Sequence, residues 1–456
     1  MKQILWSKKE LSNALGYSIN HAILTDITGI SIDSRTINKG DMFFALVGTH
    51  FNGNDFIDEA IQKGASICFS DSSMNIKNVI KVDSILDTLN KLAKYRRNTL
   101  KGKLIAITGS LGKTTTKEMF KSAFSISKKT FANIKNFNNH YGVPISLIQC
   151  PKDVKFCILE LGMNAKGEIA HLTNIVKPDI IVITNIYPVH LKSFQSIKEI
   201  AYAKSEIFKN TNNQGIAILN NESYHIDIQI SEAQKHNIRI FTFGKNDTAD
   251  CYIKSIKKTG DKLKTIKINC FNKYIEQHLQ SIVGEHLIYN ALSLFICAYI
   301  LKYNLNLVQQ ALKNFYPQPG RGKVINLKNI ILIDESYNSS PEALKMAIKN
   351  LKSLKVNGSR LLAILGDMNE LGEQSVDFHK KVKLDGIDKV FCVGKLMKNL
   401  YNQANNNVKG LCENKAIDMA DIITKHIVKN DIILVKGSLC MNMKIIIDRI
   451  KDKFTV

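Results

Sequence analysis

The chain lacks both a C-x-x-C pair among its nine cysteines and an apolar run long enough to cross a bilayer. The longest mostly apolar stretch, Ala291 to Leu301, has 11 residues, whereas a membrane-spanning helix needs about 20. The first 16 residues contain Lys8, Lys9 and Glu10, where a signal peptide needs an uninterrupted apolar core. We therefore expect buried free thiols in a reducing compartment, a cytoplasmic protein and no insertion into a membrane.

Arginine is also scarce, since it supplies only seven of the 63 basic residues, which outnumber the 40 acidic ones and give a formal net charge of +23. Arginine is the side chain that reads bases and clamps phosphates with two hydrogen bonds, and the lysines are spread over every region. We interpret the charge mainly as a solvated basic surface, without nucleic acid as a partner. An ATP-switched nucleic-acid-binding protein is the alternative from another functional class, and it predicts oligonucleotide binding that weakens steeply with salt.

Hydrophobic residues make up 45% and charged residues 23% of the 456 residues, which is ordinary globular usage and argues against disorder. At about 150 residues per domain, the length predicts roughly three domains. We expect the first domain, residues 1–98, to mix short strands and helices. Its apolar patterns predict strands at 29–33 and 42–46 and a helix at 56–63.

From residue 103 onward, apolar strands alternate with amphipathic helices, which is typical of a mostly parallel sheet covered on both faces. The strands expected in this central domain, residues 99–318, are 103–108, 154–161, 179–186, 215–220 and 238–243, before a polar strand-like stretch at 251–272 and a helix from 285 to about 303. Pro317, Pro319, Gly320 and Gly322 predict a linker, because these residues interrupt regular structure.

The alternation restarts in residues 319–456, with strands near 330–335, 361–365, 389–393 and 431–435. This pattern predicts a separate Rossmann-like domain. The expected fold class is therefore α/β with three domains: a small α/β domain, a central domain with a P-loop-type, mostly parallel sheet, and the Rossmann-like domain.

A phosphate-binding loop is predicted where the apolar strand Leu104–Thr108 meets the turn Gly109-Ser110-Leu111-Gly112 and the helix that opens with Lys113, Thr114 and Thr115. Glycines let backbone N–H groups approach an anion, and a helix N-terminus favours negative charge. Lys113 can reach the β- and γ-phosphates, and the Thr114 hydroxyl can ligate Mg²⁺. A plain strand-to-helix turn would not need all of these residues together, so we predict an ATP site.

Two further side chains stand at the ends of predicted strands. Glu160 follows the strand Phe156–Leu159, and His190 lies beyond the strand at 179–186. Ligands of such folds bind at the carboxyl edge of the sheet, and a carboxylate oxygen suits Mg²⁺. A lone Glu or His is usually a surface or capping residue, but two of them beside a P-loop favour a metal site. Lys204, on a predicted helix at 196–209, would by itself be interpreted as a solvated lysine.

The loop G-x-x-G-K-T-T has Ile107 where the common P-loop has its first glycine, and this shorter form resembles the Mur ligases and folylpolyglutamate synthetases. These enzymes join a carboxylate to an amine with ATP. The resemblance implies that Lys204, in Ala203-Lys204-Ser205-Glu206-Ile207, is carbamylated, which gives an anion able to hold a second Mg²⁺. Carbamylation needs a neutral amine, so the pKa of this lysine must be lowered by burial.

The resemblance to the Mur ligases extends over nearly the whole chain and implies further site residues. Asp33-Ser34-Arg35 resembles the uridine-diphosphate end of the later Mur ligases, and this implies that Ser34 and Arg35 contact the nucleotide. Asn136-Phe137-Asn138-Asn139 resembles a substrate-binding stretch of the family, which implies roles for Asn138 and Asn139. Without the resemblance, Ser34 and Arg35 would be interpreted as a polar turn after a strand.

Other motifs carry the resemblance into the later part of the chain. Gly284–Leu292 resembles the adenine-binding helix, with Asn290 as the expected adenine contact, and Gly320-Arg321 resembles the arginine that closes over ATP. Asp334-Glu335-Ser336-Tyr337-Asn338 and Leu365–Gly372 are similar to two further family motifs. By this match Asp334 contacts ATP, and Tyr337, Asn338 and Asp367 contact the substrates. The alternatives are an ordinary polar position at a helix start for Asn290, a solvated linker residue for Arg321, and turn or loop positions for Asp334 and Asp367.

Among the Mur ligases, the motif Glu160–Ile169 is similar to that of the member that acts last, and the string D-N-P-R, typical of the preceding member, is absent. The resemblance implies an enzyme of cell wall biogenesis that uses ATP and Mg²⁺ to join D-alanyl-D-alanine to UDP-N-acetylmuramoyl-tripeptide through an acyl phosphate. The sibling that adds the third amino acid is the alternative within the family. We expect a monomer.

Overall fold

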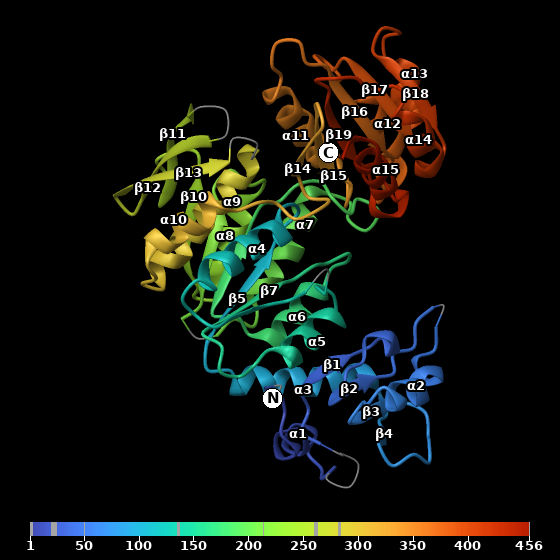
Figure 1. Cartoon of the computed structure of the whole chain (residues 1–456). Coiled ribbons are helices and arrows are strands. Elements are labelled where there is room, and N and C mark those ends of the chain that lie inside the picture. The colour runs from blue at the N-terminus through green and yellow to red at the C-terminus, as the bar shows by residue number, and fades with distance from the viewer. Residues whose placement is uncertain are drawn as a thin grey trace.

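The computed structural model describes residues 3–19, 25–49, 51–134, 137–212, 214–259, 263–280 and 284–455. Three sheets follow one another along the chain, and each is accompanied by helices (Figure 1). The N-terminal part lies at one end of the molecule, the C-terminal part at the other, and the central part between them. The predicted fold class, α/β with three domains, is confirmed.

The N-terminal sheet has four parallel strands in the order β1-β2-β3-β4. Its elements are α1 (Lys8–Leu15), β1 (Gly29–Ser31), β2 (Asp41–Phe44), α2 (Ile57–Gln62), β3 (Ile67–Ser70), β4 (Val79–Lys81) and α3 (Ile85–Thr99). β2 and β3 are buried at every position, as expected for inner strands of a parallel sheet with both faces covered. Both predicted strands and the predicted helix of this region are confirmed.

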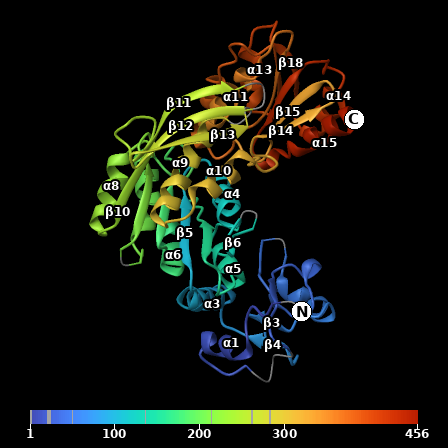
Figure 2. The ribbon, with the colours of Figure 1, turned by 60° about the vertical axis from the view of Figure 1, so that its left-hand side comes forward.

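The central sheet has nine strands in the order β13-β12-β11-β10-β9-β8-β5-β7-β6, parallel from β11 to β6 and antiparallel among β11, β12 and β13. The strands are β5 (Lys103–Thr108), β6 (Thr130–Ala132), β7 (Phe156–Glu160), β8 (Ile180–Ile183), β9 (Ile216–Asn220), β10 (Arg239–Gly244), β11 (Cys251–Thr259), β12 (Leu263–Cys270) and β13 (Lys273–Gln280). All five predicted apolar strands are present. The polar stretch forms an antiparallel extension at the edge of this sheet, and the extension reaches toward the C-terminal part in the view of Figure 2.

Helices cover both faces of the central sheet. They are α4 (Lys113–Phe124), α5 (Gly142–Gln149), α6 (Glu168–Val176), α7 (Ile197–Ser205) with the short 3-10 turn η3 (Glu206–Phe208), α8 (Ile226–Lys235), α9 (Glu285–Ile300) and α10 (Leu305–Lys313). Along β5, Ile105 and Ile107 face the core under α4, α9 and α10, whereas Leu104 and Ala106 face the core under α5 to α8. This alternation explains why the strand is apolar at consecutive positions.

The C-terminal sheet has six strands in the order β14-β15-β19-β16-β17-β18, parallel except for β14. Its elements are β14 (Lys323–Leu327), β15 (Ile330–Glu335), α11 (Pro341–Ser353), β16 (Leu361–Gly366), α12 (Ser375–Lys380), β17 (Lys389–Val393), α13 (Met397–Gln403), β18 (Lys409–Glu413), α14 (Ala416–Ile423), β19 (Ile432–Lys436) and α15 (Lys444–Phe454). One core lies under α14 and α15 and another under α11 to α13. β14 and β18, at the two edges, were not predicted.

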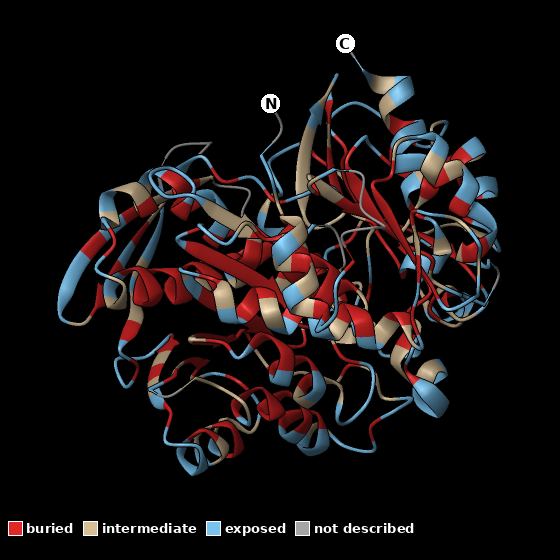
Figure 3. Ribbon diagram, turned by 90° about the horizontal axis from the view of Figure 1, so that it is seen from below, coloured by how far each residue is buried: buried red, intermediate tan, exposed pale blue. Residues whose placement is uncertain are grey.

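One hydrophobic core joins the N-terminal and central parts, because α3 packs against α5 and α6. Two arginines of α3 strengthen this joint. Arg96 lies 3.9 Å above the ring of Trp6, and Arg97 donates to the carbonyls of Val176 and Lys177 and to Asp179. Buried residues run through all three sheets (Figure 3). Within the described residues, no helix combines the length and the apolar character needed to cross a membrane.

Candidate active site

The loop between β5 and α4 is shaped by glycines and held from the neighbouring strand. Gly109 has φ +145° and Gly112 has φ +80°, backbone conformations that residues with a Cβ rarely adopt. After β8, the Thr184 hydroxyl donates to the Leu111 carbonyl at 2.6 Å, and Asn185 accepts from the Leu111 N–H at 2.8 Å. These contacts fix the loop so that α4 begins at Lys113, and the N-terminus of α4 lies beside a cavity that Ser110, Gly112 and Lys113 line.

Lys113 folds back over this loop. Its Nζ donates to the carbonyl of Gly109 at 2.8 Å and lies 3.4 Å from that of Ser110. Burial lowers the pKa of Lys113; Glu160 and Glu370 act against this shift and Arg321 adds to it. The lysine therefore stands where charges from the central and the C-terminal parts meet.

Thr114 and Glu160, two of the predicted metal ligands, are hydrogen-bonded to each other. The Thr114 hydroxyl donates to Glu160 Oε2 at 2.7 Å, and Asn138 Nδ2 donates to Oε1 at 2.8 Å. Glu160 is almost fully buried at the end of β7. Asn139 accepts from the N–H of Gly142 at the start of α5. Asn136, from the same motif, lies outside the described residues.

His190, which follows β8 in the central part, contacts the C-terminal part directly. Its Nδ1 is 2.7 Å from Glu370 Oε2, and the hydrogen bond from His190 holds the pKa of Glu370 below its usual value. Both residues have left-handed backbone, with φ +55° and +67°. No group of three or more His, Cys, Asp or Glu side chains in the described part of the chain is arranged to hold a metal ion.

Lys204, near the end of α7, is almost completely buried. Burial lowers its pKa well below the ordinary value of lysine, and the charge of Lys113 lowers it further. The neighbouring Glu206 accepts from the backbone N–H groups of Gly167 and Ala170 and so caps α6. The buried amine meets the chemical requirement for carbamylation, because CO₂ reacts with the neutral form.

The C-terminal part contributes Arg321, whose guanidinium lies 3.9 Å above the ring of Tyr337. Asp334 is buried and accepts from the Gly320 N–H and from Ser336, so it fixes the turn that carries Arg321. The next residue, Glu335, lines the cavity and pairs with Lys436 at 2.8 Å.

At the start of α9, Asn290 lies against the phosphate loop: a Cβ built on Gly112 would be 2.8 Å from Asn290 Nδ2. His286, Tyr289 and Tyr187 also line the cavity. Burial lowers the pKa of His286, so that its imidazole is neutral at neutral pH. Planar neutral groups beside a phosphate loop suit a nucleotide base.

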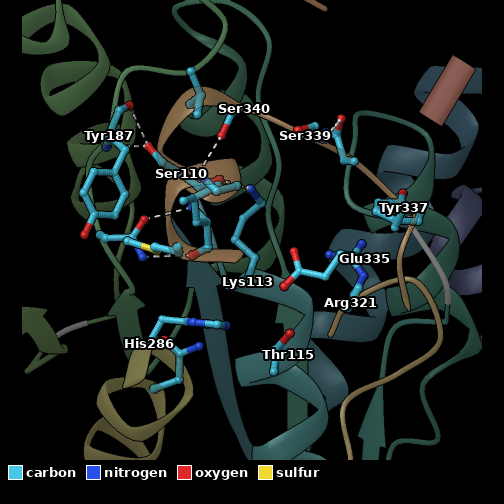
Figure 4. Close-up of a pocket in the computed structure, with 18 of the residues that line it drawn as sticks. Ser110, Lys113, Thr115, Tyr187, His286, Arg321, Glu335, Tyr337, Ser339 and Ser340 are labelled. Atoms are coloured by element: carbon cyan, nitrogen blue, oxygen red, sulfur yellow. Dashed lines mark hydrogen bonds between the residues drawn. The ribbon is translucent and has the colours of Figure 1, made fainter. Parts of the chain in front are cut away.

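Most of the predicted residues of the central and C-terminal parts meet around one cavity of about 590 Å³, whereas Lys204 and Asp334 are not among the residues that line it. Figure 4 shows Ser110, Lys113 and Thr115 on one side and Arg321 and Tyr337 on the other. The predicted residues that line it are Ser110, Leu111, Gly112, Lys113, Thr115, Asn138, Asn139, Glu160, His190, Asn290, Arg321, Tyr337 and Asn338. Gly109 and Thr114 adjoin this lining through Lys113 and Glu160.

Other predicted residues lie away from the cavity lining. Ser34 donates to Glu59, and Arg35 pairs with Asp33 on the surface of the N-terminal part, where 82% of the arginine side chain is exposed. Asp367 accepts from the N–H groups of Leu396 and Met397 at the start of α13. The contacts of Asp367 are those of a helix cap, and its role in substrate binding stays a prediction.

Sequence reasoning did not select Glu335, Glu370 or His286 as site residues, although all three line the cavity. Glu370 belongs to the motif Leu365–Gly372, which was recognised, but only the contact between the two parts of the molecule places its carboxylate beside His190. For Glu335, the signal was its position next to Asp334 in a recognised motif.

Comparison with known families accounts for most of the chain. Residues 26–101 match the Mur ligase family catalytic domain, residues 107–298 match the Mur ligase middle domain, and residues 320–439 match the Mur ligase glutamate ligase domain. The three matches follow one another in the same order as the three sheets.

Full-length relatives and solved structures agree with these matches. The UDP-N-acetylmuramoyl-tripeptide--D-alanyl-D-alanine ligase of Rickettsia prowazekii is 33% identical and aligns over 98% of this chain and 99% of its own; that of Escherichia coli is 29% identical over 98% of each. The crystal structure of MurF from Acinetobacter baumannii has a TM-score of 0.85 at 26% identity and covers 98% of this chain and 99% of its own. MurF ligase from Thermotoga maritima in complex with ADP has a TM-score of 0.81 at 25% identity, with 93% and 97% coverage. As its motifs predicted, the chain belongs to the Mur ligase family.

Proposed function

We propose that this protein is an ATP-dependent ligase that joins D-alanyl-D-alanine to UDP-N-acetylmuramoyl-tripeptide in peptidoglycan precursor synthesis. The observation that carries the proposal is one cavity in which the phosphate loop with Lys113 faces Arg321 and Tyr337 of the C-terminal part. The names of the full-length relatives support the choice of substrates. The ADP complex of a structural relative supports the choice of nucleotide.

ATP is proposed to place its triphosphate over residues 109–115 and its base near Asn290. The backbone N–H groups at the start of α4 and the Lys113 ammonium supply positive charge for the phosphates. Lys113 would exchange its bonds to the Gly109 and Ser110 carbonyls for phosphate oxygens. Arg321 approaches from the other side of the cavity, and Asp334 supports the turn that carries it.

Mg²⁺ is proposed to bind at Thr114 and Glu160. A hydroxyl and a carboxylate 2.7 Å apart beside the phosphate loop are hard oxygen donors of the kind that Mg²⁺ prefers. His190 is proposed to share this magnesium with Glu160, and a carbamylated Lys204 is the proposed ligand of a second ion. When bound, these ions would neutralise charge on the transferring phosphate. The residues fit this role by chemistry, and no distance to an ion is implied.

The chemistry requires positioning and charge neutralisation rather than a protein nucleophile. An oxygen of the terminal tripeptide carboxylate attacks the γ-phosphorus of ATP, and the bond between this phosphorus and the bridging oxygen breaks. ADP departs, and the tripeptide carries an acyl phosphate. The dipeptide amine attacks the acyl carbon, an amide bond forms, and inorganic phosphate departs. The nitrogen loses two protons overall, of which one ends on the phosphate and one in solvent.

The remaining assignments belong to the same proposal. We assign residues 1–98 to the nucleotide-sugar end with Ser34 and Arg35, 99–318 to ATP, and 319–456 to the closing domain with Tyr337, Asn338 and Asp367. Asn138 and Asn139 would meet the peptide part of the substrate. We also propose a cytoplasmic monomer. Nine free cysteines are consistent with a reducing compartment.

The proposal is tested by a coupled assay of ADP release in which ATP, the nucleotide-sugar tripeptide or the dipeptide is omitted in turn. We expect ADP only when all three are present. Release driven by a single amino acid with a nucleotide-sugar dipeptide would favour the sibling ligase. Tight oligonucleotide binding that weakens steeply with salt, without ADP release, would favour the nucleic-acid alternative.

A further inference from the structure

The positively charged side chains of the cavity do not favour binding of the amine substrate of the proposed reaction. An amine arrives at neutral pH as an ammonium ion, yet Lys113 and Arg321 both line the cavity beside the proposed phosphate site. These cations suit phosphates and carboxylates and repel a further cation. The ammonium group therefore needs a carboxylate close to the place where the acyl phosphate forms.

Most carboxylates of the cavity already have partners. Glu285 pairs with Lys349 at 2.7 Å, and Glu335 pairs with Lys436 at 2.8 Å. Glu160 accepts hydrogen bonds at both of its oxygens, and Glu168 accepts from the N–H of Asn164. Glu370 is paired with the imidazole of His190 rather than with a lysine, and 56% of its side chain is exposed.

Glu370 also stands where the reaction requires a carboxylate. It is near enough to Lys113, the proposed phosphate ligand, for the two charges to interact. Its backbone carbonyl accepts from the Lys192 N–H at 3.2 Å, so the loop of the C-terminal part is tied to the segment after His190 by a second contact. Its side chain is thus held at the junction between the phosphate loop and the closing domain.

The backbone conformation of His190 and Glu370 also indicates a functional site. His190 and Glu370 both have left-handed φ, +55° and +67°, although neither is glycine. Such conformations cost of order 1 kcal/mol each and persist where the surrounding structure enforces them, often at functional sites. Here the two residues with left-handed backbone are the two whose side chains join the central and C-terminal parts by a 2.7 Å contact.

We propose that Glu370 binds the ammonium group of the incoming dipeptide and so holds its nitrogen beside the acyl phosphate. This inference rests on the proposed function and assigns the part of the cavity around Glu370 to the amino end of the dipeptide. His190 orients the carboxylate through Oε2, which leaves Oε1 for the ammonium. Ala343 and Met346 of α11 line the cavity and offer apolar contacts to alanine methyl groups.

The test compares the wild-type protein with Glu370→Gln, which keeps the shape of the side chain and removes its charge. We expect the KM for D-alanyl-D-alanine to rise about 10- to 100-fold, as for the loss of a charged hydrogen bond, while the KM values for ATP and the nucleotide-sugar tripeptide change less than about twofold. Glu370→Asp keeps the charge and tolerates left-handed backbone, and should recover part of the loss. Glu373→Gln, an exposed change on the same loop, is the matched control and should behave like wild type.

A second readout separates binding of the amine from general damage to the loop. Propionyl-D-alanine has the shape of the dipeptide without its amine, and it should inhibit wild type and Glu370→Gln equally. An unchanged dipeptide KM, or an equal weakening of this analogue, would overturn the inference. Failure of the wild-type protein to release ADP with all substrates present would instead refute the proposed function.

Discussion

Asn290 of α9 lies directly over Gly112 of the phosphate loop, so that a methyl group at position 112 would come within 2.8 Å of the asparagine amide. Gly112→Ala would therefore displace Asn290 and would also place alanine in left-handed backbone, at a cost of roughly 1–2 kcal/mol. We expect the KM for ATP to rise about tenfold. Gly358→Ala is the control, because Gly358 has φ +77° with no described atom within 4 Å, and it should lose stability without losing ATP affinity.

Lys113→Ala should lower ADP release by about 10²- to 10³-fold, because the charge proposed to stabilise the transferring phosphate is removed. Lys121→Ala, at an exposed position in the last turn of the same helix, should keep wild-type activity. The measurement is steady-state ADP release with all substrates saturating. Full turnover by Lys113→Ala would remove this lysine from the mechanism.

Lys204→Arg should lower turnover by about 10²-fold, since arginine cannot be carbamylated and stays charged in a buried position. Burial lowers the pKa of Lys204, so its neutral form is available to CO₂ near neutral pH. Bicarbonate should therefore raise the activity of CO₂-depleted wild-type protein and leave Lys204→Arg unchanged. Lys198→Arg, exposed on the same helix, should respond like wild type; equal activity of both variants would contradict the proposal.

Arg97→Ala should lower the free energy of unfolding by about 3 kcal/mol, because it removes a nearly buried guanidinium and leaves Asp179 without its closer cationic partner. Urea denaturation followed by the fluorescence of Trp6, the single tryptophan, would measure the change in the N-terminal part. Arg35→Ala breaks an exposed ion pair with Asp33 in the same N-terminal part and should leave the urea midpoint almost unchanged. Similar losses of unfolding free energy in the two variants would show that Arg97 does not stabilise the contact between α3 and the central part.

His379 predicts a loss of stability in mild acid. Its Nε2 accepts from the Met368 N–H at 2.9 Å and its Nδ1 faces the Ser375 carbonyl at 2.6 Å, an arrangement that requires the neutral ring. Burial lowers the pKa of His379 below the unfolded value of about 6.5. The stabilisation is therefore complete above pH 6.5 and is lost as the pH falls toward the folded-state pKa, by at most about 1.4 kcal/mol per unit. Urea denaturation between pH 5 and 8 should give a smaller slope for His379→Gln than for wild type, and an unchanged slope for the exposed His171→Asn.

The elements that the sequence predicted are those with strong local signals. β5, the glycine loop and the start of α4 combine an apolar strand, two glycines and Gly-Lys-Thr within a few residues. β14 and β18 are edge strands whose residues are mainly half-buried, so they carry no continuous apolar run. β6 has only three residues, of which two are half-buried.

The residues of the candidate site also differ in how far the sequence could predict them. The phosphate loop and Glu160 could be assigned because each follows its own strand. Asp334 was selected and Glu335 was not, yet neighbouring strand residues point to opposite faces and it is Glu335 that lines the cavity. The pairing of His190 with Glu370 joins residues 180 positions apart, and only the packing of the C-terminal part against the central part reveals it.

The core shared across α3 has a mechanical consequence. Pulling the N-terminal sheet away from the central one would expose a continuous apolar surface to water, whereas the C-terminal sheet keeps cores of its own and meets the centre partly through ion pairs such as Lys349–Glu285. We therefore expect one hinge rather than two. The end proposed for the nucleotide sugar would stay fixed while the end proposed for the dipeptide swings.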